Sequence, residues 1–325
     1  MVPPTATTDG ILERALATAV RAPSAHNTQP WLWRQSGDGV DLFIDPDLVL
    51  RSADPHGRDA LLSLGALLNH LQIALAVEGR RAEIHLFPRT FDPQHVAHVD
   101  FSAPHTPTED ESALAAAIGR RRTDRRRYDP RPLAPDQLND LLERASRHGV
   151  VASVVSDEAK RSSLARAARD AAAVHSEDPE YQLELATWSG LPSPDEGVPS
   201  SNVVRSDPGA EFPARAFAGS TPETSTAGGA VGDLIVIGSE VDDGAAQLRA
   251  GEAASEMLLA ATSAGLATCP VTEPLEISEI RAEITDKVLD NRAYPQIILR
   301  LGRPMPDAPE LPLSPRRSIE DSRVR

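Results

Sequence analysis

A chain of 325 residues can bury a substantial core, and a composition with 40% hydrophobic and 25% charged residues is that of a globular protein. The formal net charge of -15 argues against general binding to nucleic acids and anionic membrane surfaces, because like charges repel. The single cysteine, Cys269, excludes an intrachain disulfide and any metal site built from several cysteines.

The N-terminal segment MVPPTATTDG has neither the basic head nor the apolar stretch of a secretory signal. No apolar run approaches the ~20 residues needed to span a bilayer. We therefore expect a cytoplasmic protein with no membrane association and no nucleic-acid partner.

Hydrophobic periodicity predicts the elements of the first part of the chain. They are a helix at 9–22, strands at WLWRQ, VDLFID and AEIHLF, and a long helix at 59–78. The long helix is apolar on most sides, so we expect it to be central. Pro23 ends the first helix, and the loop PSAHNTQPW follows it.

The second part of the chain shows similar patterns. The predicted elements are helices at 110–119, 135–146 and 157–174, the strands VVASVV and LIVIG, a helix at 243–264, the loop LATCPVTEP, a short helix and the strand PQIILRLG. From about Leu191 to Gly232 the chain is rich in Pro, Gly, Ser and Thr and has little periodicity. Long stretches of this kind are lids, binding loops or disordered segments.

One internal repeat is visible. Gly65 and Gly79 bracket the long helix of the first part, and Gly251 and Gly265 bracket a helix of the second part at the same spacing of 14 positions. The match indicates duplication, although any two buried helices have some similarity.

The loop from Pro23 to Trp31 is the most specific segment. Ser24, Asn27 and Gln29 offer hydroxyl and amide groups from a loop that a helix and a strand hold in place. Amides present a donor and an acceptor together, which suits the edge of a flavin ring. The alternative is a capped helix end followed by a turn, with Trp31 in the core.

A cluster of six arginines at Arg120–Arg127 surrounds only Thr123 and Asp124. Guanidinium groups bind phosphate in bidentate fashion, so this cluster is a candidate anion site in an otherwise acidic chain. The alternative is a solvated face at the end of a helix, where cations stabilise the dipole.

Two of these segments resemble motifs of the nitroreductase superfamily of FMN-dependent oxidoreductases. PSAHNTQPW resembles the family's PSxxNxQPW motif, with matches at Pro23, Ser24, Asn27, Gln29, Pro30 and Trp31. The arginine cluster resembles its R-x-[ST]-x-[RK] motif, with matches at Arg121, Thr123 and Arg125. The resemblance implies that Pro23, Ser24, Asn27 and Gln29 bind the flavin, and that Arg121, Thr123 and Arg125 contact its ribityl chain, phosphate and ring edge.

Two further segments extend the resemblance. GLATCPVTEP resembles the family's GLxTxPxxG segment, which passes close to flavin N5, and this implies flavin contacts from Pro270, Val271 and Thr272. It departs from the family at Glu273, where glycine is common. The family's chain end also returns basic residues to the phosphate, which makes Arg316 and Arg317 candidates; the alternative for this pair is simple solvation.

The distribution of the motifs resembles the fused, internally duplicated Acg-type branch of the family. The first part has the Asn/Gln loop and the second part has the arginine motif and the ring-proximal loop, so together they supply one complete site. The implied fold is α+β, with two pseudo-repeated halves, each a mainly antiparallel sheet flanked by helices, that mimic the family homodimer. We expect the halves at 1–108 and 109–325, a lid or loop insertion at about 188–232, and a monomer with an internal pseudo-dimer interface.

Two functions are compatible with these motifs. The first is FMN-dependent hydride transfer from NADH or NADPH to an electron-poor acceptor such as a nitroarene or quinone. Flavin N5 performs that chemistry, so no catalytic side chain is predicted. The second is an FMN-binding or storage protein whose flavin is occluded, for which Glu273 and the insertion, with Trp188 just before it, are the motivating features. No metal site is expected, since His95 and His98 stand three apart without a nearby carboxylate pair.

Overall fold

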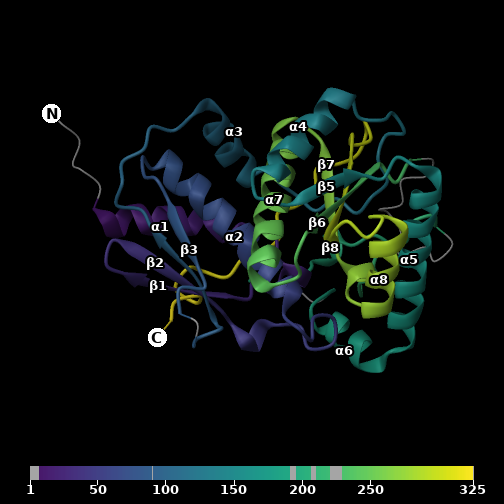
Figure 1. Ribbon diagram of the computed structural model, residues 1–325, viewed down its shortest axis with the longest axis horizontal. Coiled ribbons are helices and arrows are strands. Elements are labelled where there is room, and N and C mark those ends of the chain that lie inside the picture. The colour runs from purple at the N-terminus through teal and green to yellow at the C-terminus, as the bar shows by residue number, and fades with distance from the viewer. Residues whose placement is uncertain (1–6, 90, 191–194, 206–209, 220–228, 325) are drawn as a thin grey trace.

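Two four-stranded antiparallel sheets, each flanked by helices, make up the computed structural model of the chain (Figure 1). The structure describes residues 7–89, 91–190, 195–205, 210–219 and 229–324. The architecture is α+β, as the sequence predicts, and it is consistent with two pseudo-repeated halves.

The first half contains all the predicted elements and one further strand, β4. It comprises α1 (Thr8–Ala19), β1 (Trp31–Ser36), β2 (Gly39–Ile44), α2 (Arg58–Val77), β3 (Glu83–Leu86) and β4 (His95–Asp100). The sheet has the order β1-β2-β4-β3. The predicted helix at 9–22 is slightly too long, because α1 ends at Ala19 and Val20 is its C-cap.

The second half repeats the strand order of the first. It comprises α3 (Glu109–Ile118), α4 (Pro135–Ser146), β5 (Val151–Val154), α5 (Glu158–Glu177), α6 (Pro179–Thr187), β6 (Asp233–Ser239), α7 (Gly244–Ser263), β7 (Ala267–Val271), α8 (Ser278–Lys287) and β8 (Tyr294–Gly302). Its sheet has the order β5-β6-β8-β7, so in both halves the third strand lies at an edge, beside the fourth.

Two elements of the second half differ from the prediction. Residues 267–271, predicted as part of a loop, form β7; this strand pairs only with β8, and an edge position tolerates Pro270, which has no N–H to donate. Helix α6 was not predicted, although Asp178 caps it by accepting from the backbone N–H groups of Glu180 and Tyr181. Because α6 directly follows α5, the sequence pattern of the two helices looks like that of a single helix whose periodicity weakens toward its end.

Helices α2 and α7 cross at the centre of the molecule, between the two sheets (Figure 1). A Cβ added to Gly65 would lie 2.0 Å from the carbonyl oxygen of Leu248, and one added to Gly251 would lie 2.1 Å from that of Leu62. The contacts are reciprocal, since 251 − 65 and 248 − 62 both equal 186. This offset also relates the glycine pairs of the sequence repeat, so the repeat coincides with a pseudo-twofold contact.

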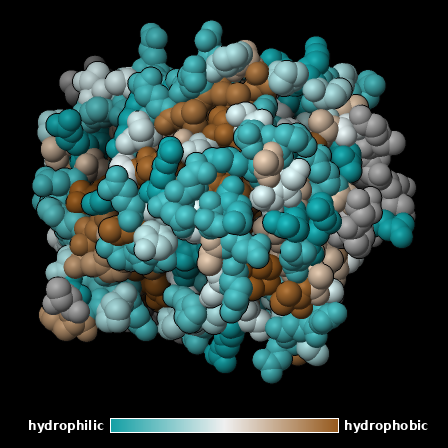
Figure 2. Space-filling model, turned by 45° about the vertical axis from the view of Figure 1, so that its right-hand side comes forward, coloured by the Kyte–Doolittle hydropathy of each residue, from teal (hydrophilic) through white to brown (hydrophobic). Residues whose placement is uncertain are grey.

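Most of α2 is buried. By length and composition it could cross a membrane, but 83% of its most apolar stretch is covered by the rest of the structure. Such burial is typical of a core helix, so this is weak evidence for a membrane span. The face in Figure 2 is mainly hydrophilic, with hydrophobic residues confined to scattered patches.

Two segments of the second half also contact the first half. The C-terminal segment returns to it, where the backbone N–H of Trp33 donates to the carbonyl oxygen of Ser322 at 2.8 Å and that of Val324 donates to Trp33 at 2.9 Å. Helix α6 makes the second contact, since the Glu184 carboxylate accepts from the backbone N–H groups of Arg51, Ser52 and Ala53. These contacts fix the relative position of the halves, between which the main pocket lies.

Candidate functional site

A pocket of about 1200 Å³, partly open to solvent, lies where the halves meet. Its walls come from the loop at 23–27, the start of α2, the arginine cluster, Val198 and residues 212–217, α7, the end of β7 and the residues after it, β8 and the C-terminal segment. Of the predicted site residues, Pro23, Ser24, Asn27, Arg121, Thr123, Arg125, Pro270, Val271, Thr272 and Arg316 line this pocket, while Gln29 and Arg317 do not. The structure thus brings segments from both ends of the chain to one cavity.

The loop after α1 is held in an unusual backbone conformation. His26, Asn27 and Gln29 have positive φ angles of 46°, 59° and 55°. Such values cost energy for residues other than glycine, and in proteins they concentrate at functional sites. Ser24 Oγ stabilises the turn by accepting from the backbone N–H of Gln29 at 3.0 Å, and Ser63 Oγ on α2 accepts from that of Ala25 at 3.2 Å.

Asn27 joins three segments at the pocket edge. Its Nδ2 donates to the carbonyl oxygens of Gly197 and Pro315 at 3.0 and 3.1 Å, and its Oδ1 accepts from Arg316 Nη1 at 2.6 Å. The Asn27 side chain therefore ties the loop to Gly197 and to the C-terminal segment, in addition to facing the pocket.

Gln29 and Arg317 differ from the expectation that they contact a cofactor. Gln29 is fully buried; its Nε2 donates to the carbonyl oxygen of Asp195 at 2.8 Å and its Oε1 accepts from the backbone N–H of Arg317 at 2.9 Å. The Arg317 guanidinium lies 3.8 Å from Asp45 Oδ2 and donates to Ser322 Oγ. The pair anchors the C-terminal segment outside the pocket wall.

Arg316 lines the pocket, but the hydrogen bonds of its guanidinium are made to other groups of the protein. The guanidinium donates to the carbonyl oxygens of Val20, Arg21 and Ala22 at 2.9–3.1 Å, as well as to Asn27. These carbonyls lie at the C-terminal end of α1, where helices leave acceptors unsatisfied and cations are favourable. The structure thus shows Arg316 binding the carbonyls after α1, and its contact with a phosphate stays a prediction.

Arg121 and Arg125 form a positive wall of the pocket together with Arg300 of β8, which the sequence did not single out. Arg125 Nη1 donates to the carbonyl oxygen of Asn202 at 3.1 Å, and its guanidinium lies 4.7 Å from the Phe217 ring centroid. Arg121 is buried, and its Nε has no hydrogen-bond partner among the described residues. A buried, unpaired donor on a charged group is costly unless a ligand satisfies it.

The charge on this wall is not balanced locally. Burial is the main reason why the pKa of Arg121 is lowered to about 10. The positive charges of Arg21, Arg122 and Arg125 lower it further. An anion in the pocket would relieve both effects, so these residues fit the phosphate group of a cofactor.

The loop after β7 forms another wall. Thr272 Oγ1 donates to Glu276 Oε1 at 2.9 Å, and Glu273 lines the pocket with its Oε1 3.5 Å from His175 Nδ1. Glu273, which departs from the family pattern, is thus buried and lies beside His175. Cys269 is buried, and burial raises the pKa of its thiol. This agrees with a small buried residue, as opposed to a reactive thiolate.

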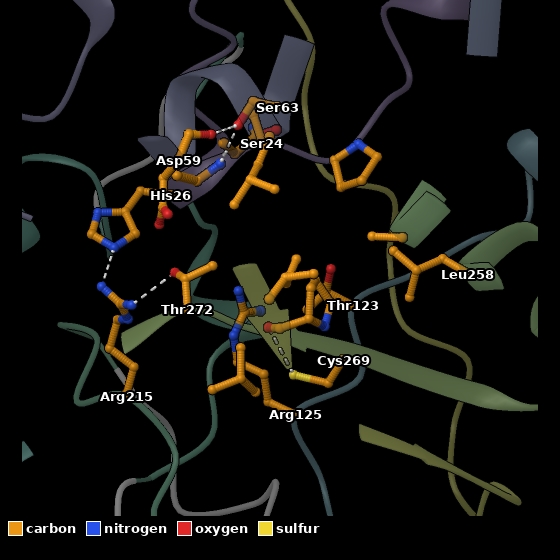
Figure 3. Close-up of a pocket in the computed structure, with 18 of the residues that line it drawn as sticks. Ser24, His26, Asp59, Ser63, Thr123, Arg125, Arg215, Leu258, Cys269 and Thr272 are labelled. Carbon is orange, nitrogen blue, oxygen red and sulfur yellow. Dashed lines mark hydrogen bonds between the residues drawn. The ribbon is translucent and has the colours of Figure 1, made fainter. Parts of the chain in front are cut away.

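Arg215 is the centre of a network that the sequence did not reveal. It lies in the predicted insertion, of which residues 191–194, 206–209 and 220–228 fall outside the described residues. Its guanidinium donates to His26 Nε2 at 2.7 Å and to Thr272 Oγ1 at 3.4 Å (Figure 3). It also donates to the Tyr181 hydroxyl at 2.7 Å and forms an ion pair with Glu276. In the sequence, the only feature that marked this region was its lack of periodicity between Leu191 and Gly232.

The network fixes His26 in its neutral form. Arginine only donates, so Nε2 of His26 must be the acceptor and the ring proton must lie on Nδ1. Burial, followed by the charges of Arg215 and Arg125, lowers the pKa of His26 well below its usual value. Phe212 and Phe217 flank Arg215 and also line the pocket, so this segment covers one side of the cavity.

Two acids at the start of α2 stand out electrostatically. Asp59 is buried and lines the pocket. Asp54 is also buried but does not line it, and its Oδ2 accepts from the backbone N–H of Ala60 at 2.8 Å. Burial, followed by the negative charge of Asp59, raises the pKa of Asp54 to about 7.

This shift predicts a pH dependence of stability. Between the unfolded pKa of about 4 and the folded pKa of about 7, the native state binds more protons at Asp54 than the unfolded state, so stability falls as pH rises. Asp54→Asn keeps the capping oxygen but cannot ionise. We expect the variant to match the wild type at pH 4 and to exceed it at pH 8 by up to about 4 kcal/mol in urea unfolding, since the pKa is raised from 3.8 to about 7 and each unit is worth about 1.4 kcal/mol. Parallel pH profiles would contradict the shift.

His95 and His98 both face Asp41. Its Oδ1 lies 3.1 Å from His95 Nε2 and 2.8 Å from His98 Nδ1, and Oδ2 lies 3.2 Å from Arg34. Within the part of the chain that the structure describes, no group of three or more His, Cys, Asp or Glu side chains could hold a metal ion.

Comparison with known proteins identifies relatives over nearly the whole chain. Residues 118–303 match the model of the nitroreductase family. A "Putative NAD(P)H nitroreductase" of Mycobacterium tuberculosis is 44% identical over 308 residues, which cover 94% of this chain and 88% of that protein. The "Putative NAD(P)H nitroreductase acg" of the same organism is 36% identical over 98% of this chain and 97% of its own length. Among solved structures, a "putative nitroreductase" from Anabaena variabilis aligns with a TM-score of 0.47 and 13% identity, over 94% of this chain and 90% of that chain.

Proposed function

This chain belongs to the nitroreductase family, and from that premise we propose that it is an FMN-dependent oxidoreductase. In this proposal it binds one FMN in the pocket between the halves and passes hydride from NADH or NADPH to an electron-poor acceptor, such as a nitroarene or quinone. The observation that carries the proposal is the convergence of three family motifs on one cavity whose arginine wall lacks a counter-charge. The relatives named for NAD(P)H-dependent nitroreduction support the choice of reductant.

Each wall has a distinct task in this proposal. Arg121, Arg125 and Arg300 hold the phosphate and neutralise its charge. Ser24 and the strained loop around it border the cavity opposite the segment Pro270–Thr272, so a planar ring fits between them (Figure 3). FMN supplies the hydride chemistry when bound, and the protein supplies position and charge.

We further propose that residues 1–108 and 109–325 are the two halves of a duplicated unit that replaces the family homodimer. The equal strand order and the reciprocal contacts of Gly65 and Gly251 support this division. One chain then contains its own interface, so we propose a monomer, located in the cytoplasm. Analytical ultracentrifugation tests the monomer: a mass near 34.8 kDa is expected, and a stable mass of twice that value would refute it.

A second candidate function is flavin storage without turnover. The observation that favours it is the tethering of two described stretches over the pocket: in residues 212–217, Arg215 bonds to His26 and Glu276, and in residues 195–205, Gly197 bonds to Asn27. A segment fixed in this way would occlude a bound flavin from nicotinamide and acceptor.

One spectroscopic experiment separates the two functions. The purified protein, reconstituted with FMN, is placed under anaerobic conditions, and its visible spectrum is recorded before and after NADPH and then NADH. Prompt bleaching supports the oxidoreductase. A flavin spectrum that resists both nucleotides but bleaches with dithionite supports storage. If FMN does not bind at all, both proposals fail.

A further inference from the structure

The pocket between the halves is not uniformly positive. Among the described residues that line it, Asp59 and Glu273 are the acids. In Figure 3 Asp59 lies at the upper left of the cavity, on the same side as His26, and Arg125 lies at its lower edge. The side of the pocket away from the arginine wall therefore presents a carboxylate.

The Asp59 carboxylate has unused capacity to accept hydrogen bonds. Asp59 is only 3% exposed, and its Oδ1 lies 2.6 Å from Arg58 Nη2. This contact is an ion pair without hydrogen-bond alignment, since Oδ1 has no hydrogen-bond partner among the described residues, and none of them donates to Oδ2. Buried polar groups nearly always have such partners, and a carboxylate can accept about four hydrogen bonds. A ligand in the pocket is the group that can donate to Asp59.

The neighbouring acids have partners within the protein. Asp54 accepts from the backbone N–H of Ala60 at 2.8 Å. Glu276 accepts from Thr272 Oγ1 at 2.9 Å and forms an ion pair with Arg215. Neither Asp54 nor Glu276 lines the pocket, so Asp59 is the acid of this group that a ligand can reach.

A carboxylate at this position favours a ligand group that donates N–H bonds and disfavours one that carries a negative charge. Nitro and quinone groups, which belong to the acceptors of the proposed function, only accept hydrogen bonds. The nicotinamide ring of the reductant carries a primary carboxamide, which has two N–H donors. Thr272, from the segment that borders the proposed ring position, lies on the same side of the cavity as Asp59 (Figure 3). The reductant therefore has the group that matches this side of the pocket.

We propose that Asp59 recognises the carboxamide of the nicotinamide ring by accepting a hydrogen bond from its NH₂ group. Arg58 holds the carboxylate in place through the ion pair, and its own position is fixed by the carbonyl oxygen of Gln296, to which its Nη1 donates. The subsite then takes a ring with a primary amide and discriminates against the same ring with an acetyl or a carboxylate group. This role rests on the proposed oxidoreductase function, in which a nicotinamide nucleotide enters the pocket.

The experiment compares three oxidised dinucleotides that differ only in the group on the pyridine ring. They are NADP⁺, 3-acetylpyridine adenine dinucleotide phosphate and nicotinic acid adenine dinucleotide phosphate, with a carboxamide, an acetyl and a carboxylate group, respectively. Each is titrated into the oxidised FMN-reconstituted protein, and binding is followed by calorimetry, with the matching NAD⁺ series in parallel. The wild type should bind the carboxamide form about 10-fold or more tightly than either other form, because a hydrogen bond to a charged group is lost in the acetyl form and replaced by repulsion in the carboxylate form.

Four variants identify the residue responsible. Asp59→Ala should bind the carboxamide and acetyl forms within about twofold of each other. Asp59→Asn, which keeps the size of the side chain, guards against a variant that fails to fold; it should retain FMN within about twofold and lose the discrimination against the carboxylate form. Asp47→Asn, on an exposed acid of the same half, is the matched control and should keep the wild-type preference. Glu273→Gln, at the other acid that lines the pocket, should keep it as well.

Three results would overturn the proposal: equal binding of the carboxamide and acetyl forms by the wild type, a preference that survives in Asp59→Ala and Asp59→Asn, and a preference that disappears in Glu273→Gln instead. Failure of the proposed function gives a different result, in which NADPH and NADH do not reduce the bound flavin. Because oxidised nucleotides only need to bind, their order of affinity is measured in that case too, so the two failures are distinguishable.

Discussion

Replacing Arg121 and Arg125 together by glutamine is expected to weaken FMN binding by roughly 10²- to 10⁴-fold. Each guanidinium can form charge-assisted hydrogen bonds with the phosphate, worth about 1.5–3 kcal/mol apiece. The two side chains line the same cavity, and the unpaired Nε of Arg121 is a donor that a phosphate oxygen would satisfy. Titration of the apo-protein with FMN, followed by fluorescence quenching, measures the change. The affinity of the wild type should also fall more steeply with salt than that of the variant, because fewer charges contact the phosphate in the variant.

The same substitution should make the apo-protein more stable. Lowering the pKa of Arg121 from 12.5 to about 10 corresponds to roughly 3 kcal/mol of unfavourable interaction for the charged form. Glutamine removes that charge while keeping a polar side chain, so we expect a gain of about 1–3 kcal/mol in unfolding free energy without FMN. Arg120→Gln, at an exposed arginine of the same cluster, is the control and should change neither quantity. A double variant that binds FMN as tightly as the wild type would remove the arginine cluster from the site.

The sequence predicted the fold well where burial and periodicity agree. The long apolar helix at 59–78 and the strand PQIILRLG are found as α2 and β8, since each is buried along nearly its whole length and its pattern leaves no competing structure. β7 was missed because Pro270 and a short apolar run are typical of a loop, and only the pairing with β8 makes this segment a strand. That pairing depends on residues distant in sequence, which local patterns cannot report.

For the site, motif resemblance located the walls but not the functions of individual atoms. Arg316 was expected at a phosphate, yet its donors bind the carbonyls at the end of α1, which are more than 290 positions away along the chain. Arg215 and Asp59 carried no local signal: one lies in a segment without periodicity, and the other is an ordinary first-turn acid of a helix. The contact of Arg215 with His26 joins residues 189 positions apart, and Asp59 reaches the pocket wall only when α2 is packed in place, so neither could be found from the local sequence.

The crossing of α2 and α7 leads to the prediction with the largest effect on stability. Gly65→Ala and Gly251→Ala are each expected to cost more than about 4 kcal/mol, beyond the usual range for overpacking, because each new Cβ would lie about 2 Å from a backbone oxygen of the other helix. Backbone cannot rotate away as a side chain does, so the helices must separate along the main contact between the halves.

The reciprocal geometry makes this prediction sharper than a single substitution would. Since Gly65 and Gly251 occupy equivalent positions of the pseudo-twofold contact, the two variants should lose similar amounts of unfolding free energy in urea, and both should lose FMN, because Gly251 and Leu62 also line the pocket. Gly119→Ala is the matched control: it has a helical φ of -69° and nothing within 4 Å of the added Cβ, so it should be neutral or slightly stabilising. A small loss of unfolding free energy in both variants would mean that the two helices can move apart with little loss of stability. The pocket between the halves would then be free to change its width, and the arginine wall and the loop at 23–27 would no longer be held at a fixed separation.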